Sequence, residues 1–376
     1  MLKIGITGKS GFLGTHLFNY LGLFSEKYTL VPFNKFFFTD ESLLKEFVSQ
    51  CDIIVHFAAL SRHTEPNVVY ETNIKLVKKL ISAMESENVT PHVLFSSSIQ
   101  EESDNEYGNS KLLGRQLFEQ WASRNNSNFT GMLFPNVYGP FGKPNYVSFI
   151  ATFCYKLIHN ETPEVFVDSS VKLIYVGNLV RHIINKIDSV DICKESQVDC
   201  HSVPFDCVMK VTEVLQLLKF FKNSYLDQDI MPKLLNDNDL NLFNTFHSYI
   251  NHRKYFPRRL IQHSESKGCL IEVNLGVDGQ LSTLKKSEEI LIGNNFHTQK
   301  IKRFTVINGN ARLQTRRIGA DEVLSFYLKG EESSYVDIPI WHTHNISNVG
   351  NEKLEAQFEI NENYNPNQVD TYFESV

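Results

Sequence analysis

The chain has 376 residues, of which 42% are hydrophobic and 21% charged, and its formal net charge is −6. This length exceeds one ordinary domain and suits two. The charges are interspersed, which argues against a nucleic-acid-binding protein with a basic domain or stripe. No apolar run reaches about 18 residues, so we expect no transmembrane helix. The first residues lack the apolar segment and cleavage site of a signal peptide, so we expect a cytoplasmic protein.

Six cysteines are present and none forms a C-x-x-C pair. Cys193, Cys200 and Cys207 recur every seven residues, which matches no usual zinc spacing. We therefore expect free thiols in a reducing compartment.

The first element is a short buried strand over residues 2–8, followed by a turn and a helix over 9–23. Gly8, Gly11 and Gly14 have the spacing G-x-x-G-x-x-G. In a dinucleotide site such glycines make a tight turn, let the backbone approach a pyrophosphate and let helix and strand pack closely. The pyrophosphate would bind at the helix N-terminus. The predicted cofactor-binding residues of this turn are Gly8, Ser10, Gly11, Phe12, Leu13 and Gly14.

Strands and helices then alternate along the chain. We predict strands over 28–33, 52–60 and 91–98, and helices over 40–50, with Asp40 as its cap, and over 71–88. This alternation indicates parallel βαβ units, in which ligands bind beyond the carboxyl ends of the strands. Ala58 and Ala59, and the serines Ser96, Ser97 and Ser98, fall at that edge.

The segment after the second strand bears on the choice of cofactor. An NAD enzyme usually carries an acid there for the ribose 2′-hydroxyl. This chain has Asn34 and Lys35 instead. A cation at this place suits a 2′-phosphate, so we predict NADPH in preference to NAD.

A second group of residues lies in "SSSIQEESDNEYGNSK". Tyr107 and Lys111 are four residues apart and share one face of a helix. A nearby ammonium stabilises a phenolate, so we expect Lys111 to lower the pKa of Tyr107 from its usual value of about 10. Tyr107 would then act as a general acid or base. The hydroxyl of Ser98, at the end of the preceding strand, is placed to bind a substrate oxygen.

These residues resemble the extended short-chain dehydrogenase/reductase family. The segments T-G-x-x-G-F-L-G (7–14), the serine cluster, Y-G-x-S-K (107–111) and "FPNVYGP" (134–140) match in order and spacing. The resemblance implies that Tyr107 is the general acid/base and that Lys111 also binds the nicotinamide ribose. It implies that Ser98, or alternatively Ser97, polarises the substrate carbonyl. It places Pro135 and Asn136 near the nicotinamide. Members of this family often act on nucleotide-linked sugars.

The last third of the chain has a different pattern. Residues 252–266 are polar and basic and are interrupted by Pro257, so we interpret them as the connection between domains. Short β-rich stretches follow, which predict an all-β sandwich or barrel. Within "VINGNARL", Asn308-Gly309 suits a type I′ turn and predicts a hairpin.

This region resembles the cupin family, whose two boxes supply three histidines and a glutamate to a metal. His297 and His344 stand at two of these positions, and Asn295 and Lys302 replace the other two. An ammonium does not bind a metal, so we predict no metal ligands. His342, two residues from His344, remains a candidate third imidazole. His297 and His344 are candidate catalytic bases.

As a whole, the chain resembles bifunctional capsular-polysaccharide enzymes of the CapF type, also called WbjC or FnlB. "SSSIQ", "YGNSK", "KPNYVSFIATFCYKL" and the C-terminal "NPNQVDTYFESV" carry this resemblance. It implies a Rossmann-like α/β reductase domain over 1–250 and a cupin domain over 258–376. We also expect the protein to be a homodimer that binds neither nucleic acid nor membrane.

The family's activity implies C4 reduction of a UDP-linked 2-acetamido-2,6-dideoxy-4-keto-hexose with NADPH, and C3 epimerisation in the cupin. The product would be of the UDP-6-deoxy-L-talosamine or UDP-N-acetyl-L-rhamnosamine type. One alternative is an NAD-dependent sugar 4-epimerase or 4,6-dehydratase with the cupin as a dimerisation module. Another is a non-catalytic scaffold, against which the intact Tyr107 and Lys111 pair argues.

Overall fold

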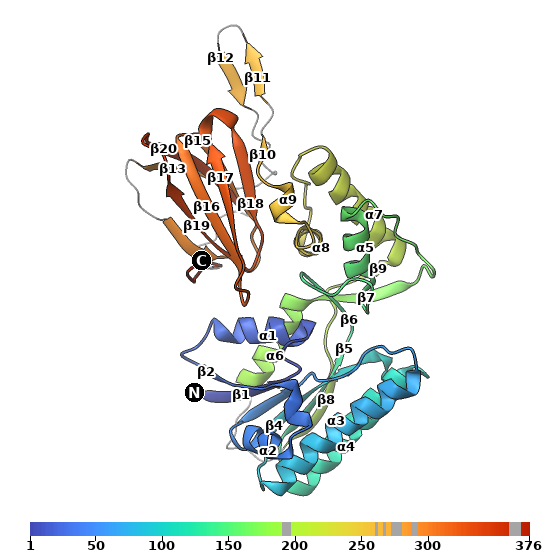
Figure 1. The fold of residues 1–376 in the computed structure, drawn as a ribbon. Coiled ribbons are helices and arrows are strands. Elements are labelled where there is room, and N and C mark those ends of the chain that lie inside the picture. The colour runs from blue at the N-terminus through green and yellow to red at the C-terminus, as the bar shows by residue number, and fades with distance from the viewer. Residues whose placement is uncertain (190–196, 260–261, 266–267, 272–279, 287–291, 361–369) are drawn as a thin grey trace. The chain divides into compact units, whose positions relative to one another are not determined.

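The computed structural model describes residues 1–189, 197–259, 262–265, 268–271, 280–286, 292–360 and 370–376 (Figure 1). It forms two compact units. The first comprises Met1–Thr152 and Val165–Glu213, and the second comprises Phe153–Glu164 and Val214–Val376. Each unit is described by itself below.

The first unit is built on a parallel sheet of six strands in the order β2-β1-β3-β4-β5-β8. Its apolar, β-branched strands are buried, as expected where both faces are covered. Strand β1 pairs with β2 on one side and with β3 on the other, so the strand order reverses beside β1. Ligands of such sheets bind where the strand order reverses, beyond the carboxyl ends. The strands are β1 (Leu2–Thr7), β2 (Tyr28–Val31), β3 (Ile53–His56), β4 (His92–Ser98), β5 (Phe129–Phe134) and β8 (Val198–Ser202).

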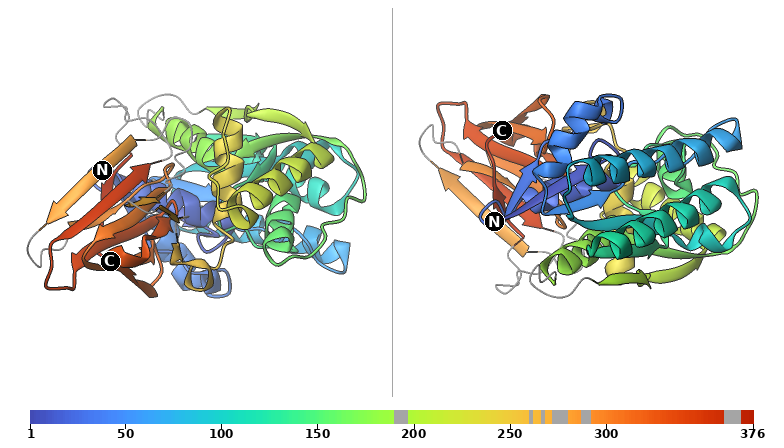
Figure 2. Two further views of the ribbon diagram at one scale, coloured as in Figure 1. Left: turned by 90° about the horizontal axis from the view of Figure 1, so that it is seen from above. Right: turned by 90° about the horizontal axis from the view of Figure 1, so that it is seen from below.

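Helices cover both faces of this sheet (Figures 1 and 2). Helices α1 (Phe12–Gly22) and α6 (Val176–Asp188) pack together on one face, and α2 (Glu41–Ser49), α3 (Pro66–Ser86) and α4 (Glu106–Asn125) pack on the other. Asp40 caps α2 as predicted, since its carboxylate accepts the Leu43 N–H at 3.2 Å. Helix α3 begins before the predicted residue 71, because Pro66 fits the first helical turn, where its missing N–H is not needed.

The remaining elements complete both units. A small sheet in the first unit joins β6 (Asn136–Tyr138), β7 (Ser170–Tyr175) and β9 (Cys207–Lys210). Helix α5 (Phe149–Ile158) crosses the division, and α7 (Val211–Phe221) begins just before it. A π-helix (Lys222–Asp227), α8 (Asp237–His247) and α9 (His252–Tyr255) belong to the second unit. The π-helix, α8 and α9 therefore share a compact unit with the β region. The domain boundary near residues 250–258 stays a prediction.

The β region of the second unit contains two five-stranded antiparallel sheets and the short pair β11-β12. The first sheet has the order β10-β18-β15-β20-β13, and the second has the order β17-β16-β19-β14-β21. Apolar side chains such as Phe304, Val306, Leu313 and Ile346 form a shared core. The predicted fold class, a Rossmann-like α/β sheet followed by an all-β region, is confirmed. The strands are β10 (Arg258–Arg259), β11 (Gln262–Glu265), β12 (Gly268–Ile271), β13 (Gln280–Lys286), β14 (Ile292–Phe296), β15 (Lys302–Asn308), β16 (Asn310–Arg317), β17 (Val323–Lys329), β18 (Ser334–Ile338), β19 (His342–Asn348), β20 (Leu354–Ile360) and β21 (Tyr372–Phe373).

The predicted hairpin at Asn308-Gly309 is wrong. Strand β15 pairs with β18 and β20, whereas β16 pairs with β17 and β19. Only Gly309 has a positive φ, +77°, whereas a type I′ turn requires two such residues. A Cβ on Gly309 would lie 2.9 Å from the Lys353 carbonyl oxygen. The glycine therefore lets the chain pass from one sheet to the other, close to a neighbouring backbone.

The segment predicted to connect the domains is partly structured. Residues 252–255 form α9, Phe256 is buried in the core, and β10 pairs with β18. Within the described residues, Cys51, Cys154, Cys200 and Cys207 are free thiols, as expected. The side chains of Cys193 and Cys269, and residues 365–369 of the C-terminal segment, lie outside the described part. No helix of the described residues is long and apolar enough to cross a membrane.

Candidate active sites

The glycine turn after β1 has the close backbone approach that a dinucleotide site needs. Gly8 has a φ of +75°, and a Cβ there would lie 2.8 Å from the Ala58 nitrogen. A Cβ on Gly14 would lie 2.3 Å from the Gly8 carbonyl oxygen, which also accepts the Gly11 N–H at 2.9 Å. No larger side chain fits this turn, and α1 begins directly after it, with its N–H groups available to an anion. At the turn, Ser10 and Gly11 are exposed, and Phe12 and Leu13 are half-buried.

The loop after β3 runs beside this turn and is fixed by two polar side chains. The Thr7 hydroxyl accepts the Ala58 N–H at 3.3 Å, and Ala58 and Ala59 are half-buried. Asn73 of α3 accepts the Leu60 N–H at 2.7 Å and donates to the Leu60 carbonyl at 3.0 Å. Sequence reasoning missed Asn73. Its signal is a polar residue on the buried, apolar face of the helix, where it is 4% exposed.

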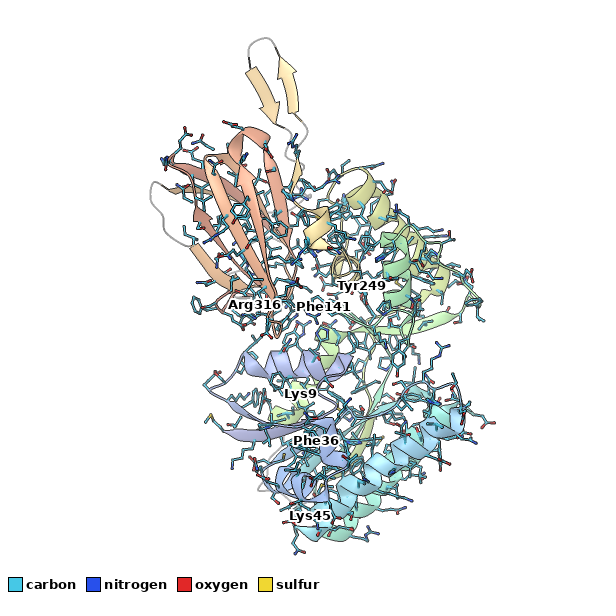
Figure 3. All side chains as sticks on the ribbon, viewed as in Figure 1. Lys9, Phe36, Lys45, Phe141, Tyr249 and Arg316 are labelled. Carbon is cyan, nitrogen blue, oxygen red and sulfur yellow. The ribbon has the colours of Figure 1, made fainter. Side chains whose placement is uncertain are left out.

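The residues predicted to select the cofactor follow β2. The Asn34 side chain accepts the Phe36 N–H at 3.3 Å and caps a 3₁₀ turn (Lys35–Phe38), whose first residue, Lys35, is exposed. The other cation near the glycine turn, Lys9, packs along α1, with its ammonium 4.5 Å from the centre of the Phe18 ring (Figure 3). Among the residues that the structure describes, the Lys35 ammonium takes part in no hydrogen bond or ion pair, and its role in selecting the cofactor stays a prediction.

Pro135 and Asn136 follow β5 at the same carboxyl edge of the sheet. Pro135 is buried and Asn136 is exposed. The Asn136 amide donates to the Lys172 carbonyl at 3.4 Å, which attaches this residue to strand β7. β5 pairs with β4, so both residues follow the strand next to the one that ends in Ser98, and their position near a nicotinamide stays a prediction.

The three serines that end β4 use their hydroxyl protons differently. Ser96 donates to the His56 carbonyl at 3.0 Å, and Ser97 donates to the Glu101 carboxylate. Ser98 instead accepts the Gln100 N–H at 3.1 Å. A hydroxyl has one donor and two acceptor positions, so only Ser98 keeps its proton available for another acceptor. This favours Ser98 over Ser97 as the substrate-binding hydroxyl.

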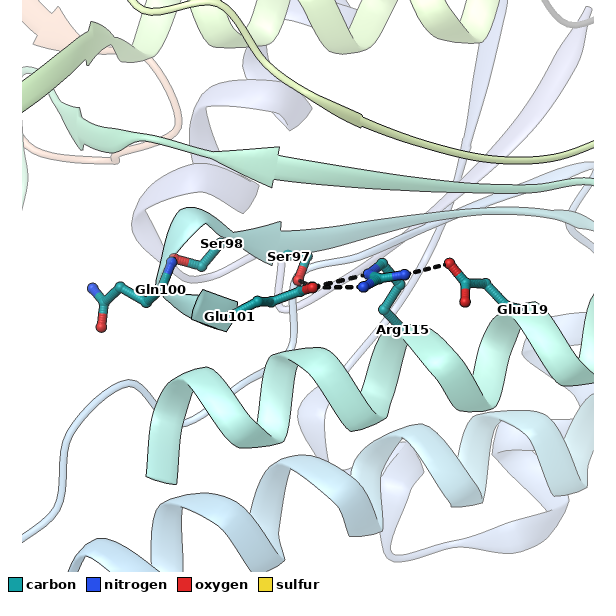
Figure 4. A network of polar contacts seen from close by, with 6 residues as sticks. All are labelled: Ser97, Ser98, Gln100, Glu101, Arg115 and Glu119. Atoms are coloured by element: carbon teal, nitrogen blue, oxygen red, sulfur yellow. Dashed lines mark hydrogen bonds and ion pairs between the residues drawn. The ribbon is translucent and has the colours of Figure 1, made fainter. Parts of the chain in front are cut away.

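A buried ion-pair network holds the 3₁₀ turn (Ile99–Glu102) that carries Ser98 onward to α4 (Figure 4). Arg115 of α4 donates through Nε to both Glu101 oxygens at 3.1 and 3.0 Å, and through a terminal nitrogen at 2.7 Å. Its other terminal nitrogen contacts Glu119 at 2.6 Å. The Glu101 side chain is 5% exposed. The network therefore fixes the serine segment against the helix of Tyr107 and Lys111.

Tyr107 and Lys111 share one face of α4, with the ammonium 5.7 Å from the centre of the Tyr107 ring. Lys111 donates to the Ser96 carbonyl at 2.7 Å. The expected lowering of the Tyr107 pKa is wrong for this structure. Burial and, to a smaller extent, the nearby Tyr146 phenol together raise the pKa of Tyr107 to about 12. Burial lowers the pKa of Lys111 to about 8, against the opposing charge of Glu101. Tyr107 is therefore protonated at neutral pH and suits the role of proton donor.

The second unit brings the two predicted cupin histidines together. The His297 and His344 ring centres lie 6.2 Å apart, and the side chains are 5% and 1% exposed. His297 donates through Nδ1 to the Asp370 carbonyl, which leaves Nε2 as a lone-pair acceptor. Burial lowers the pKa of His297, and burial followed by the charge of Lys302 lowers the pKa of His344 well below its usual range. Both imidazoles are therefore neutral.

The replaced ligand positions and the third histidine have separate environments. Asn295 is directly opposite His344 across the β14-β19 pair. His342 is half-buried, and its ring centre lies 6.0 Å from that of His252. Its Nδ1 lies 3.0 Å from the Ile340 carbonyl oxygen. Among the described residues, no three His, Cys, Asp or Glu side chains are grouped so as to hold a metal ion.

The geometry of the first unit defines a nucleotide-dependent enzyme of the short-chain dehydrogenase class. Residues 4–194, half of the chain, match the NAD dependent epimerase/dehydratase family, and residues 263–372 match the polysaccharide biosynthesis C-terminal domain. The chain belongs to the NAD dependent epimerase/dehydratase family.

Two relatives match over the full length, which confirms the resemblance to CapF-type chains. The crystal structure of the capsular polysaccharide assembling protein CapF from Staphylococcus aureus is 31% identical, with a TM-score of 0.62 and all of both chains covered. A Pseudomonas aeruginosa strain PA103 protein named UDP-2-acetamido-2,6-beta-L-arabino-hexul-4-ose reductase is 28% identical, covering 100% of this chain and 99% of its own length. RMD from Pseudomonas aeruginosa complexed with NADPH shares the fold at 18% identity, with a TM-score of 0.52 over 59% of this chain and 84% of its own.

Proposed function

We propose that the first unit reduces the C4 ketone of a UDP-linked 2-acetamido-2,6-dideoxy-4-keto-hexose. The observation that carries this proposal is the pair of available protons beyond β4, on the hydroxyls of Ser98 and Tyr107. A ketone reduction needs a proton donor for the oxygen, and both groups are protonated at neutral pH. The name of the Pseudomonas aeruginosa relative supports this substrate class.

The chain's own residues divide the work as follows. The Ser98 O–H donates to the C4 oxygen and orients the ketone, and Tyr107 transfers its proton to that oxygen as negative charge develops. The Lys111 ammonium, held by the Ser96 carbonyl, stabilises the resulting phenolate. A nicotinamide cofactor bound at the glycine turn supplies the hydride. Its pyrophosphate would be held by backbone N–H groups at the start of α1, because Gly8, Gly11 and Gly14 leave room for it.

NADPH is the proposed donor, because the exposed Lys35 stands where an NAD enzyme carries an acid. The test compares kcat/KM for NADPH and NADH in the parent enzyme and in Lys35→Ala. Lys35→Ala should weaken NADPH by about tenfold, in line with about 1.4 kcal/mol for one exposed phosphate contact, and leave NADH unchanged. Equal losses with both cofactors would contradict the proposed preference.

In the second unit, the proposed activity is epimerisation at C3, next to the ketone. The neutral His297 Nε2 has a free lone pair, and its Nδ1–H is fixed on the Asp370 carbonyl, as expected of an oriented base. The His344 imidazole beside it also has no hydrogen-bond partner among the described residues. Epimerisation followed by reduction would give a UDP-6-deoxy-L-talosamine type product. The UDP-N-acetyl-L-rhamnosamine type would need hydride delivery to the opposite face of C4.

One pair of assays separates the two activities. UDP-4-keto-sugar is incubated in D₂O without NADPH, and C3 deuteration is followed by NMR; NADPH oxidation is measured separately. Tyr107→Phe should abolish NADPH oxidation and leave C3 exchange intact, and the exposed Tyr327→Phe serves as the matched control. Persistent reduction in Tyr107→Phe would refute the catalytic assignment.

The same assays address the alternatives. If the parent enzyme introduces no deuterium at C3, the epimerase proposal fails and the dimerisation interpretation replaces it, with light scattering reporting the expected homodimer. If tightly bound NAD co-purifies and no NADPH is consumed, the chain is instead a sugar 4-epimerase or 4,6-dehydratase.

A further inference from the structure

Lys302 occupies the inner face of the first β-sheet in the second unit. On β15 it is followed by Arg303 and Phe304, and side chains alternate between the two faces of a strand. Phe304 packs in the core between the sheets, whereas Arg303 forms an ion pair with Asp337 on the other face. The Lys302 side chain lies on the core side, with its ammonium 4.9 and 4.5 Å from the centres of the Phe304 and Phe358 rings.

The histidines face this lysine from the opposite sheet. The His344 ring centre on β19 lies 5.3 Å from that of Phe304, which also contacts Lys302, and His297 lies next to His344. The Lys302 charge is close enough to lower the pKa of both imidazoles. Lys302 and Asn295 keep partial solvent exposure, while both imidazoles are buried. One cation and two neutral bases therefore share one region of the core.

The cation has no counter-charge within the described residues. The carboxylates of Asp337 and Glu359 lie opposite Arg303 on its own face of the sheet, and the Asp370 carboxylate accepts the N–H groups of Thr298 and Gln299. No hydrogen bond or ion pair of the described part involves the Lys302 ammonium, whose contacts there are the two aromatic rings. A largely buried cation without a carboxylate is costly to the fold unless an anion meets it during function.

Several buried polar atoms of this region also have no hydrogen-bond partner in the part of the chain that the structure describes. They are the Nε2 of His297, both ring nitrogens of His344 and the Oδ1 of Asn295. Unsatisfied buried groups are uncommon in native proteins, and a cluster of them indicates a ligand site. Its donors and acceptors match a sugar ketone with neighbouring hydroxyls better than a metal, since a cation stands among them.

We propose that the Lys302 ammonium stabilises the enolate formed at C4–O during C3 epimerisation, and so replaces a metal ion as the electrophile of this site. This inference rests on the proposed epimerase activity. It goes beyond that activity by assigning the stabilisation of the enolate charge to Lys302, a residue type that cannot bind a metal ion.

The step balances without a co-reactant. His297 Nε2 takes the proton from C3, the C–H electron pair becomes the C3=C4 double bond, and the carbonyl electrons move to the oxygen beside Lys302. The His344 N–H delivers a proton to the opposite face of C3, which restores the ketone, and the other ring nitrogen of His344 takes up a proton from solvent. His297 returns its proton to solvent, so that nothing is oxidised, reduced or consumed.

The test measures C3–H exchange in D₂O without NADPH for the parent, Lys302→Met and Lys302→Arg. Met keeps the length and apolar contacts but removes the charge, so exchange should fall about 100-fold or more, the usual loss for one charge-stabilising group. Arg should retain part of the rate. Lys329→Met, an exposed lysine of the same unit, is the matched control and should exchange at the parent rate. Urea unfolding followed by circular dichroism reports folding of each variant.

Chemical rescue separates a catalytic charge from a structural one. Exchange in Lys302→Ala should recover in part when ethylammonium is added, which a purely structural loss would not do. Parent-like exchange in Lys302→Met refutes the inference while the epimerase activity stands. Absence of exchange in the parent refutes the epimerase proposal itself. Covalent trapping of substrate on Lys302 by borohydride, seen by mass spectrometry, would also overturn the inference, since it indicates an imine and not a fixed charge.

Discussion

The three serines at the end of β4 give a sharp test of the reductase site, because their hydroxyl protons are committed differently. Ser98→Ala removes the one hydroxyl that accepts from Gln100 N–H and keeps its own proton free. If that proton binds the substrate oxygen, kcat should fall about 10²–10³-fold, or about 2.7–4 kcal/mol, as for loss of one oxyanion donor. The unpaired Gln100 N–H should also lower stability by about 1 kcal/mol.

Ser97→Ala is the matched comparison. Its hydroxyl donates to Glu101, and loss of this bond should cost stability by about 1.5–3 kcal/mol, as for a hydrogen bond to a charged group. Glu101 keeps its three contacts with Arg115, so the turn should hold its shape. We therefore expect kcat within about threefold of the parent, because no transition-state contact is removed.

The assay is NADPH oxidation with saturating UDP-4-keto-sugar, with urea unfolding followed in parallel. Ser98→Thr, which keeps the hydroxyl, should retain much of the activity. The reasoning is refuted if Ser97→Ala loses as much kcat as Ser98→Ala, or if Ser98→Ala keeps full kcat while losing stability alone.

Three further predictions concern cofactor binding, the buried ion pair and pH. Gly14→Ala should weaken cofactor binding by at least about tenfold, measured by fluorescence titration, because its Cβ would lie 2.3 Å from the Gly8 carbonyl oxygen. Arg303→Met should lower the free energy of unfolding by about 3–5 kcal/mol, because it leaves the Asp337 carboxylate buried without the guanidinium that contacts it at 2.7 and 2.8 Å. The double variant Arg303→Met/Asp337→Leu should recover most of this loss in urea unfolding, and no recovery would contradict the reasoning. Burial lowers the pKa of His247 to about 3, so the unfolded chain binds more protons than the folded chain between about pH 3 and 6.5. The free energy of unfolding should therefore be highest above pH 6.5 and should fall by about 1.4 kcal/mol per pH unit below it. If His247→Gln leaves the slope of unfolding free energy against pH unchanged, this histidine is not responsible.

The sequence was most informative where a residue type has one local physical meaning. The glycine triplet, the Asp40 cap and the alternation of apolar strands with helices all depend on neighbours in the chain, and the structure contains each of them. The four-residue spacing of Tyr107 and Lys111 placed both on one face of α4 for the same reason.

Long-range packing decided what the sequence left open. The Asn308-Gly309 turn has the residues of a hairpin, but its strands pair with partners elsewhere in the chain. The choice of Ser98 over Ser97 depends on Glu101, whose position is fixed by Arg115 of another element. The Tyr107 pKa rises because the side chain is buried, and the neighbouring Tyr146 phenol also raises it.

The second unit shows the same division. The sequence by itself determined that His297 and His344 stand at two of the four ligand positions of the cupin pattern, and that Asn295 and Lys302 stand at the other two. Only the tertiary structure decided that the two ring centres lie 6.2 Å apart and that His342 lies beside His252. It also decided that Lys302 lies on the core side of its strand, with no carboxylate paired to it among the described residues. Residue identity fixes which chemistry is available. Distance, burial and the commitment of each proton depend on segments far apart in the chain, and these are set only when the sheets pack.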